Sequence, residues 1–254
     1  MSASGDGIRI RGVSKRFGSQ AVLDGLDLHI PRGEQRVILG RSGQGKSVLL
    51  KLIVGLLDPD AGSIEVDGQE VPRDRRSELY TLRRRFSMVF QGGALFDSMS
   101  ILDNITLALK EHTQLPAREI ADRGQRALSM VGLPEVGAKF PSELSGGMRK
   151  RASLARAIIE EPDYILYDEP TTGLDPITSD AINRLIQSLA HELGVTSIVV
   201  THDMQSAFTV GERFALLNNG KIVYEGSKAE ARAVSDGPMR QFIDGTAEGP
   251  LDSF

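Results

Sequence analysis

The sequence predicts an α/β protein in which a mostly parallel β-sheet carries helices on both faces. Short, continuously apolar runs at 36–39, 86–90, 164–167 and 197–200 alternate with helical patterns, as in sheets that are buried on both sides. The order of elements adds two further parts. The alternating segment 8–30 is typical of antiparallel strands, and the middle of the chain carries helical patterns with few strand signals.

Local patterns define the elements that follow the antiparallel strands. The apolar run 36–39 predicts a buried strand that ends in a glycine-rich loop, and 47–57 predicts an apolar helix directly after that loop. A further strand is predicted at 63–71, with a turn at Asp67-Gly68. The run 86–90 predicts another buried strand, which ends before Gln91.

Helical patterns dominate the middle of the chain. Three helices are predicted there, at 101–112, 116–132 and 146–160. We therefore expect an inserted helical subdomain at 92–161. The sheet-containing core and the antiparallel β-subdomain are expected to share 6–91 and 162–235, within a single domain at 6–240.

The last third returns to alternating strands and helices. One helix is predicted between the strands at 164–167 and 197–200, and its apolar face is formed by residues four apart: Ile177, Ala181, Leu185, Leu189 and Leu193. After Phe214 we expect a hairpin that turns at Asn219-Gly220, and then a short helix. The tail at 236–254 is rich in glycine, proline and acidic residues and is expected to lie on the surface.

Composition narrows the classes of protein to consider. The 254 residues are 40% hydrophobic and 25% charged, which fits a globular domain. The net charge of −4 argues against nucleic acid as the main partner. There is no cysteine for disulfides or thiolate metal sites. Residues 1–7 lack the features of a secretory signal, and no apolar run is long enough to span a membrane, so we expect a cytoplasmic location.

Two basic clusters stand out against this acidic balance, Arg83-Arg84-Arg85 and Arg149-Lys150-Arg151. We expect both to be solvated surface charges that balance the 34 acidic residues. Contact with lipid headgroups or with a partner is the alternative.

The glycine-rich loop after 36–39 has the form GxxxxGK[ST] of a phosphate-binding loop. Glycine allows its backbone N–H groups to turn inward around phosphate oxygens, and the following helix points its positive end at them. Lys46 is expected to contact the β- and γ-phosphates of a nucleoside triphosphate, and the Ser47 hydroxyl to ligate Mg²⁺. The residues expected to bind ATP here are Gly40, Arg41, Ser42, Gly43, Gln44, Gly45, Lys46, Ser47 and Val48.

Two carboxylates end the apolar strand 164–167. Asp168 and Glu169 lie at its carboxyl end, where ligands bind in doubly wound sheets. Asp168 is expected to support the Mg²⁺ shell, and Glu169 to orient and deprotonate the attacking water. Together with the loop at 40–47, they predict a P-loop NTPase with a RecA-like core.

A third motif, Leu144-Ser145-Gly146-Gly147-Met148, makes the prediction narrower. With a phosphate-binding loop upstream and Asp168-Glu169 downstream, the chain resembles the ATP-binding subunit of ABC transporters over nearly all its length. The resemblance implies that Gln91 contacts Mg²⁺ or the attacking water, and that His202 contacts the γ-phosphate. It places Phe17 where an aromatic ring stacks on adenine, although packing in the core would equally explain a phenylalanine on a strand.

The same resemblance implies a homodimer in which two ATP molecules lie between the copies. In this family the subunits pair head to tail, and each LSGG motif covers the γ-phosphate held by its partner. Ser145, Gly146, Gly147 and Asp175 would therefore complete the nucleotide site of the second copy.

Several segments resemble the MlaF-type ATPases of MCE-associated phospholipid transport. They are 79–83, 90–97, 111–116, 141–148 and 240–245. The resemblance implies an integral membrane permease above the dimer, docked at 92–105, an MCE-domain lipid-binding protein and a STAS-domain regulatory protein. It also implies a peripheral location on the cytoplasmic face of the inner membrane, and a tail at 236–254 that reaches the neighbouring subunit.

Two alternatives remain. The chain could be the ATPase of another ABC importer, for an amino acid or a metal chelate. It could also be a soluble ABC-type ATPase that acts on DNA or ribosomes, although it has one cassette, no heptad run and no basic excess.

Overall fold

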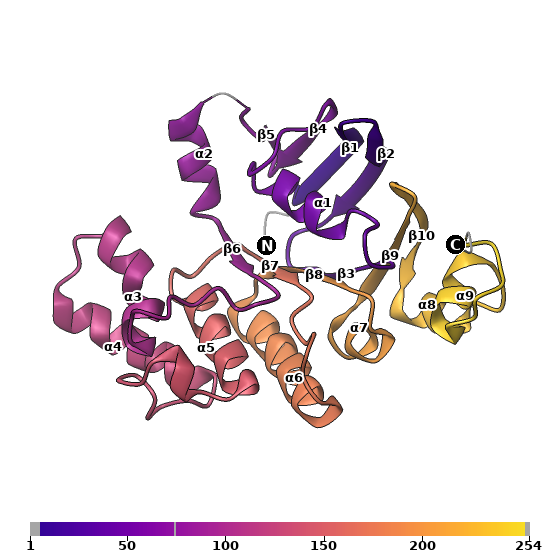
Figure 1. Ribbon diagram of the computed structural model, residues 1–254. Helices are drawn as coiled ribbons and strands as arrows, with labels where there is room; N and C mark the ends of the chain where they lie inside the picture. Colours follow the sequence, from indigo (N-terminus) through magenta and orange to yellow (C-terminus); the bar gives the residue numbers. More distant parts are fainter. Residues whose placement is uncertain (1–5, 74, 252–254) are drawn as a thin grey trace, which may run out of the picture.

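Two β-sheets form the layers of the computed structural model, which describes residues 6–73 and 75–251 (Figure 1). The smaller sheet is antiparallel and has the strand order β2-β1-β4-β5. Its strands are β1 (Ile8–Phe17), β2 (Gln20–Ile30), β4 (Ala61–Val66) and β5 (Gln69–Glu70). The strand predicted at 63–71 is therefore two strands, which meet at the predicted turn, where Asp67 and Gly68 have positive φ.

The larger sheet has the order β10-β9-β3-β8-β7-β6. Neighbours from β9 to β6 pair in parallel, whereas β9 and β10 form an antiparallel hairpin. Its strands are β3 (Gln35–Leu39), β6 (Phe86–Val89), β7 (Tyr164–Asp168), β8 (Thr196–Thr201), β9 (Arg213–Asn218) and β10 (Lys221–Ser227). The predicted fold class is confirmed.

Helix α1 (Lys46–Ile53) lies between the two sheets, and most other helices lie below the larger one (Figure 1). It ends four residues before the predicted Leu57, because the chain turns at Gly55, where φ is 65°. The remaining helices are α2 (Arg76–Arg83), α3 (Ile101–His112), α4 (Ala117–Met130), α5 (Gly146–Ile158), α6 (Pro176–Leu193), α7 (Met204–Val210), α8 (Lys228–Ala233) and α9 (Gly237–Asp244), with a 3₁₀ turn at Pro141–Glu143. The sequence patterns missed α2, α7 and α9.

Both faces of the larger sheet are buried, and alternate residues of each strand face opposite sides. From β3, Ile38 packs with the apolar residues of α1 and of the antiparallel sheet. Val37 and Leu39 pack on the other side, with the apolar residues of α5, α6 and α7. This two-sided burial explains why the parallel strands are continuously apolar in sequence.

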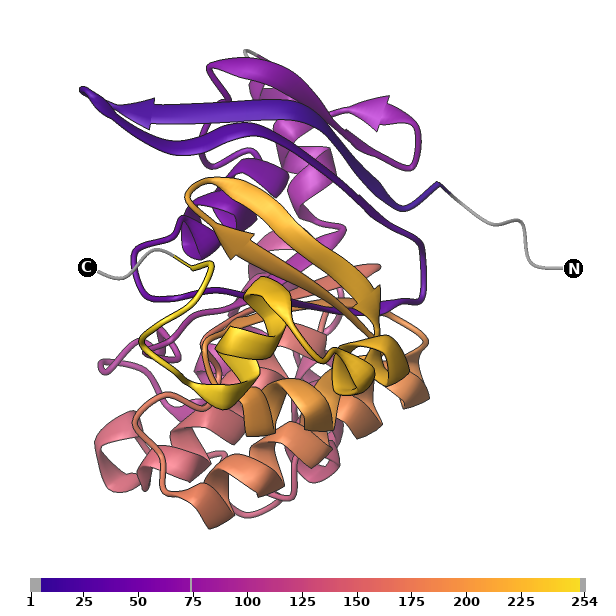
Figure 2. The same ribbon diagram turned by 90° about the vertical axis from the view of Figure 1, so that its right-hand side faces the viewer.

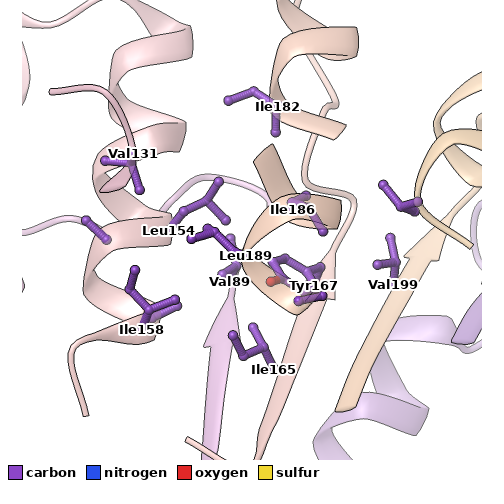
Figure 3. Packing of buried hydrophobic residues seen from close by; sticks show 14 of the residues in the cluster. Val89, Val131, Leu154, Ile158, Ile165, Tyr167, Ile182, Ile186, Leu189 and Val199 are labelled. Carbon is purple, nitrogen blue, oxygen red and sulfur yellow. The ribbon is translucent and has the colours of Figure 1, made fainter. Parts of the chain in front are cut away.

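The predicted apolar face of α6 is right for Leu185, Leu189 and Leu193, which pack on the core, and wrong for the exposed Ile177 and Ala181. Ile177 is 84% exposed, and the most deeply buried apolar side chains are Ile182, Ile186 and Leu189. Figure 3 shows Ile186 and Leu189 beside Tyr167 of β7. A row of residues four apart turns by about 40° at each step around a helix with 3.6 residues per turn. Over sixteen residues such a row leaves the buried face.

The expectation of a surface tail holds for residues 244–250, which are exposed, but the tail also folds and buries three of its side chains, Met239, Gln241 and Leu251. Beyond Asp236 the chain forms α9 and folds back on itself beside β10 and α8 (Figure 2). Met239 is buried and Leu251 is only 4% exposed. The Gln241 side chain holds this return, since its Oε1 accepts a hydrogen bond from the Leu251 N–H at 2.6 Å. Residues 252–254 lie outside the described chain, as do residues 1–5 of the N-terminal segment considered for a secretory signal.

The two basic clusters are not simple solvated faces. Arg85 pairs with Asp67 and Asp163, and Arg83 donates hydrogen bonds to the Val54 and Gly55 carbonyls. Lys150 is buried. Arg83, Arg84 and Arg149 are exposed, as expected for solvated charges. The contacts of Arg85 with carboxylates and of Arg83 with backbone carbonyls, and the burial of Lys150, are not predicted by a count of charges.

Within residues 6–73 and 75–251, no helix combines the length and apolar character needed to cross a bilayer.

Candidate functional site

The phosphate-binding loop lies between the end of β3 and the start of α1. Gly45 has φ of 97°, and a Cβ there would come within 2.9 Å of Val22 Cγ1 on β2. At Gly40 a Cβ would come within 2.7 Å of the Leu217 carbonyl oxygen. Both glycines are therefore required by close packing, which holds the loop backbone at the N-terminus of α1, where N–H groups attract anions.

Lys46 points from the first turn of α1 back across the loop. Its Nζ donates to the Gly40 carbonyl at 2.6 Å and to the Arg41 carbonyl at 3.1 Å, and it lies 3.3 Å from Glu169 Oε1. The ammonium thus joins the loop to the end of β7. A buried cation in this place favours a polyanionic ligand, because phosphate oxygens would add to its partners.

Ser47 and Asp168 lie together although 121 residues separate them: the Ser47 hydroxyl donates to Asp168 Oδ1 at 2.8 Å. Hydroxyl and carboxylate oxygens are the hard ligands that Mg²⁺ prefers, and Mg²⁺ is usually held by one or two carboxylates with phosphate oxygens and water. In the described chain no group of three His, Cys, Asp or Glu side chains could hold a metal alone. The residues present therefore fit Mg²⁺ bound together with a triphosphate.

Glu169 has an unusual backbone, with φ of 49°. Such a conformation costs free energy in a residue with a Cβ and is often found at functional sites. Its N–H donates to the Val200 carbonyl, and its carboxylate lies 2.9 Å from His202 Nδ1, at the end of neighbouring strand β8. The carboxylate is thus held between Lys46 and His202 at the carboxyl edge of the sheet.

One cavity of about 430 Å³ collects most of the predicted site. Its lining comes from β1, β2, the loop, α1, the end of β6 and the ends of β7 and β8. The predicted residues that line it are Phe17, Ser42, Gly43, Gly45, Lys46, Ser47, Val48, Gln91, Glu169 and His202. Phe17 is 47% exposed, so the core-packing alternative does not account for its position.

Four predicted residues lie behind or beside this cavity, and one of them, Asp168, contacts it through Ser47. Gly40 supports Lys46 through its carbonyl. Gln44 turns outward, where its Oε1 accepts from the Asn219 N–H at 2.5 Å. Arg41 lines a neighbouring cavity together with Ser42, His202 and residues of the tail. Gln20 and Val22 of β2 were missed; they line the nucleotide cavity, and nothing in a strand of alternating pattern marks them.

The remaining predicted residues form a second group outside the described lining of this cavity. Ser145 caps α5, with its Oγ accepting from the Met148 N–H at 3.3 Å, and Asp175 caps α6, accepting from the Ile177 and Thr178 N–H groups at 3.0 Å. A hydrogen bond from Thr178 lowers the pKa of Asp175. A Cβ on Gly147 would lie 2.6 Å from Thr178 Cγ2, so the two helix starts are in contact.

Sequence comparison agrees with this geometry. The ABC transporter family matches residues 23–172. The chain is 46% identical to the intermembrane phospholipid transport system ATP-binding protein MlaF of Escherichia coli (strain K12), over 96% of this chain and 91% of that protein. It is 43% identical to the probable ribonucleotide transport ATP-binding protein mkl of Mycobacterium leprae (strain TN), over 97% of this chain and 71% of that protein.

A solved structure of similar fold is the dimeric, post-hydrolysis state of an ATP-binding cassette bound to ADP and Pi. It superposes with a TM-score of 0.79 at 33% identity, over 87% of this chain and 98% of that chain.

Proposed function

This chain belongs to the ABC transporter family as an ATP-binding and ATP-hydrolysing subunit, and we propose that it drives phospholipid transport between membranes through a separate permease. The observation that carries the proposal is the 46% identity to MlaF of Escherichia coli, which extends over 96% of the chain. The similarity reaches well beyond residues 23–172, where the family itself is matched.

We propose that the working unit is a homodimer with two nucleotides at its interface. Similar ABC cassettes form dimers. Support from this chain is the separation of its two groups: the cavity holds the phosphate-binding loop, whereas Ser145, Gly146, Gly147 and Asp175 lie at the starts of α5 and α6. In a head-to-tail dimer, those helix starts would meet the γ-phosphate held by the other copy.

Within each site, the loop backbone and Lys46 would bind the phosphates of ATP, and Phe17 would stack on the adenine ring. Ser47, Asp168 and Gln91 would hold Mg²⁺, which neutralises phosphate charge when bound. Binding of a triphosphate would give Lys46 new partners and release Glu169 from its contact with this ammonium.

Glu169 would then act as the general base. Its carboxylate would orient the attacking water and take up its proton, and His202 would hold the carboxylate from the other side and contact the γ-phosphate. The strained backbone of Glu169 supports this role, because it aims the side chain into the cavity instead of along the edge of the sheet.

The proposed division places the core and β-subdomain at 6–91 and 162–235, the helical subdomain at 92–161 and the tail at 236–254. The permease would dock at 92–105, beside Gln91. An MCE-domain lipid-binding protein and a STAS-domain regulatory protein complete the proposed assembly, with this chain on the cytoplasmic face of the inner membrane. The surface helices α3 and α4 offer the STAS protein a docking face.

A second candidate has one specific observation in its favour. The mkl protein, whose name describes probable ribonucleotide transport, is 43% identical, close to the value for MlaF. A polar solute importer would use the same ATPase cycle, so the distinction rests on the partner proteins and their cargo.

Purification of the tagged chain from detergent-solubilised membranes tests the proposal. We expect recovery with a permease and a lipid-loaded MCE protein, and ATP-dependent movement of labelled phospholipid after reconstitution between two vesicle populations. Recovery with a solute-binding protein and ATP-dependent uptake of a ribonucleotide would overturn the phospholipid assignment. Recovery with ribosomes or DNA would overturn the transport function as well.

A further inference from the structure

The loop that follows β6 is held from behind by three side chains of α5. The Gln91 carbonyl accepts a hydrogen bond from Lys150 Nζ. The Gly93 carbonyl accepts from Ser153 Oγ at 3.0 Å and from Arg156 Nη2 at 3.0 Å. The Ala94 carbonyl accepts from Arg156 Nη1 at 2.6 Å. One helix thus satisfies a run of backbone carbonyls in a loop that has no strand or helix of its own.

The loop also fits this helix closely. Gly93 and Ala94 have positive φ, and a Cβ on Gly93 would lie 2.6 Å from Ser153 Oγ. The turn is closed by the Gly93 N–H, which donates to the Phe90 carbonyl at 2.8 Å. The loop therefore cannot slide along α5 without breaking these contacts, and the two are expected to move together.

Among these three side chains of α5, Lys150 is the one whose burial is unfavourable for the stability of the fold. It is 8% exposed, and burial lowers the pKa of its ammonium. Among the described residues, no carboxylate lies within ion-pair distance of Lys150, and the Gln91 carbonyl is the acceptor of its hydrogen bond. A buried ammonium without a counter-ion destabilises the fold. Such exceptions are expected where function requires them.

The two ends of Gln91 connect different parts of the molecule. Gln91 lines the nucleotide cavity with Lys46 and Glu169, and its carbonyl is bound to Lys150. Ser145 is the N-cap of the same helix. Lys150 follows it by five residues, a distance of about 7.5 Å along the helix axis.

We propose that Lys150 is a positioning residue: it aims the Gln91 side chain into the nucleotide cavity and ties that position to the helix that begins with Ser145. The inference rests on the role proposed above for Gln91. In this inference α5 supports two groups at once. It positions Gln91 in the nucleotide site of its own chain, and it carries the LSGG motif that would complete the nucleotide site of the other copy.

Lys150→Met in the full chain tests this assignment. Methionine keeps the length and buries well but cannot donate a hydrogen bond. We expect kcat for ATP to fall about tenfold while KM changes less than about threefold. Lys150→Arg restores a donor and should recover most of the turnover. Arg151→Met is the matched control: it removes a cation from the same helix that contacts the Gly132 carbonyl instead of the loop, and it should keep turnover near wild type.

A double-mutant cycle separates positioning from a general effect on the fold. If Lys150 acts through the Gln91 side chain, then Lys150→Met should cost nothing further in a Gln91→Ala background. Additive losses would overturn the proposal, because they would mean that Lys150 supports some other part of the site. Should Lys150→Met prevent folding, Lys150→Ala, which also removes the hydrogen-bond donor and leaves a smaller side chain, takes its place in the same cycle.

Thermal unfolding and one further variant complete the design. If Lys150 only stabilises the fold, Lys150→Met should lose stability and turnover together. If Lys150 is a positioning residue, removing its unpaired buried charge should leave the unfolding midpoint within about 4 °C of the wild-type value. Wild-type kcat in Lys150→Met overturns the inference alone if Glu169→Gln is inactive in the same assay. Full activity of Glu169→Gln would instead overturn the proposed function of the site.

Discussion

Glu169 is the residue on which the proposed chemistry depends. It follows directly from β7, and its carboxylate is shared between Lys46 at 3.3 Å and His202 at 2.9 Å. A carboxylate between two nitrogen groups is well placed to exchange one of them for a water molecule when a triphosphate binds Lys46. Its strained φ fixes the direction in which the side chain points.

Glu169→Gln should therefore remove hydrolysis and keep binding. The amide has nearly the same shape but cannot accept a proton, so turnover should fall by about a hundredfold or more. ATP affinity should remain close to wild type, and an ATP-bound dimer should accumulate. Single-turnover hydrolysis with labelled ATP and size-exclusion chromatography measure the two effects. Turnover near wild type would show that another group accepts the proton.

The Asp67 carboxylate connects several elements of the fold through hydrogen bonds. Its oxygens accept hydrogen bonds from Arg32 Nε at 2.9 Å, from Tyr164 Oη at 3.0 Å and from Arg85. Burial alone would raise the pKa of Asp67, but hydrogen bonds from Arg32, Arg85 and Tyr164 outweigh it and hold this pKa well below its usual value.

This depressed pKa has a defined sign for stability. Because the pKa is lower in the folded state, the stabilisation is fully present above the unfolded value of about 3.9 and is lost as pH falls from there toward the folded pKa. Asp67→Asn should lower the free energy of unfolding by about 2–4 kcal/mol at pH 7. The difference from wild type should shrink below about pH 4.

Urea unfolding at pH 7 and at low pH measures this difference. Asparagine tolerates positive φ, so the substitution leaves the turn itself intact. Asp60→Asn, an exposed carboxylate that pairs with Lys15, is the control and should change stability far less. A loss that is the same at both pH values would mean that the charge of Asp67 is not what stabilises the fold.

At the scale of elements, helix α6 shows that sequence periodicity can locate a helix, whereas tertiary packing determines which of its faces is buried. Its start is fixed locally, by Asp175 as cap and Pro176 in the first turn. Its buried face depends on how the helix lies against β7 and α5. The row from Ile177 to Leu193 includes true core residues only at its end, where it crosses the face of Ile182, Ile186 and Leu189 (Figure 3).

Two isoleucines of α6 provide a direct test of this face. Ile186 is 1% exposed and Ile177 is 84% exposed. Ile186→Ala should therefore cost about 2–5 kcal/mol of unfolding free energy, and Ile177→Ala about 0.5 kcal/mol or less. Chemical denaturation without nucleotide measures both, so that contacts between copies do not contribute. Equal losses would support the face indicated by four-residue spacing.

The same contrast explains which parts of the site could be predicted. The loop at 40–47 and the pair Asp168-Glu169 carry their signals in contiguous residues, so their meeting at one edge of the sheet could be expected. Gln20, Val22 and Lys150 enter through tertiary contacts between distant elements and have no local signal. The return of Leu251 onto the core was missed for that reason too, since it depends on Gln241 ten residues earlier.

At the scale of the whole molecule, the proposed dimer would use two groups of residues from each chain in different nucleotide sites. The cavity with Lys46 lies at the carboxyl edge of the sheet, and the caps Ser145 and Asp175 begin two helices outside its described lining. In this proposal the starts of α5 and α6 do not reach the γ-phosphate position of their own chain. A head-to-tail dimer would supply them to both nucleotides.

Complementation between two inactive variants tests this division. Lys46→Ala removes the phosphate contact, and Ser145→Arg places a bulky side chain at the start of α5, so each homodimer has two defective sites. In a mixed dimer both defects fall in the same site. The other site combines the intact loop of the Ser145→Arg chain with the intact LSGG motif of the Lys46→Ala chain. Mixed dimers, isolated through two different affinity tags, should hydrolyse ATP well above either homodimer.

The outcome depends only on which chain completes which site. If each chain closed its own motif over its own nucleotide, the mixed dimer would hold one chain without Lys46 and one with a blocked helix start, and neither could work. Its activity would then equal the average of the two homodimers. Ser145→Ala, which removes the cap hydroxyl without adding bulk, measures how much of the Ser145→Arg effect comes from loss of the cap. Rescue in the mixed dimer alone would establish that two copies build each site.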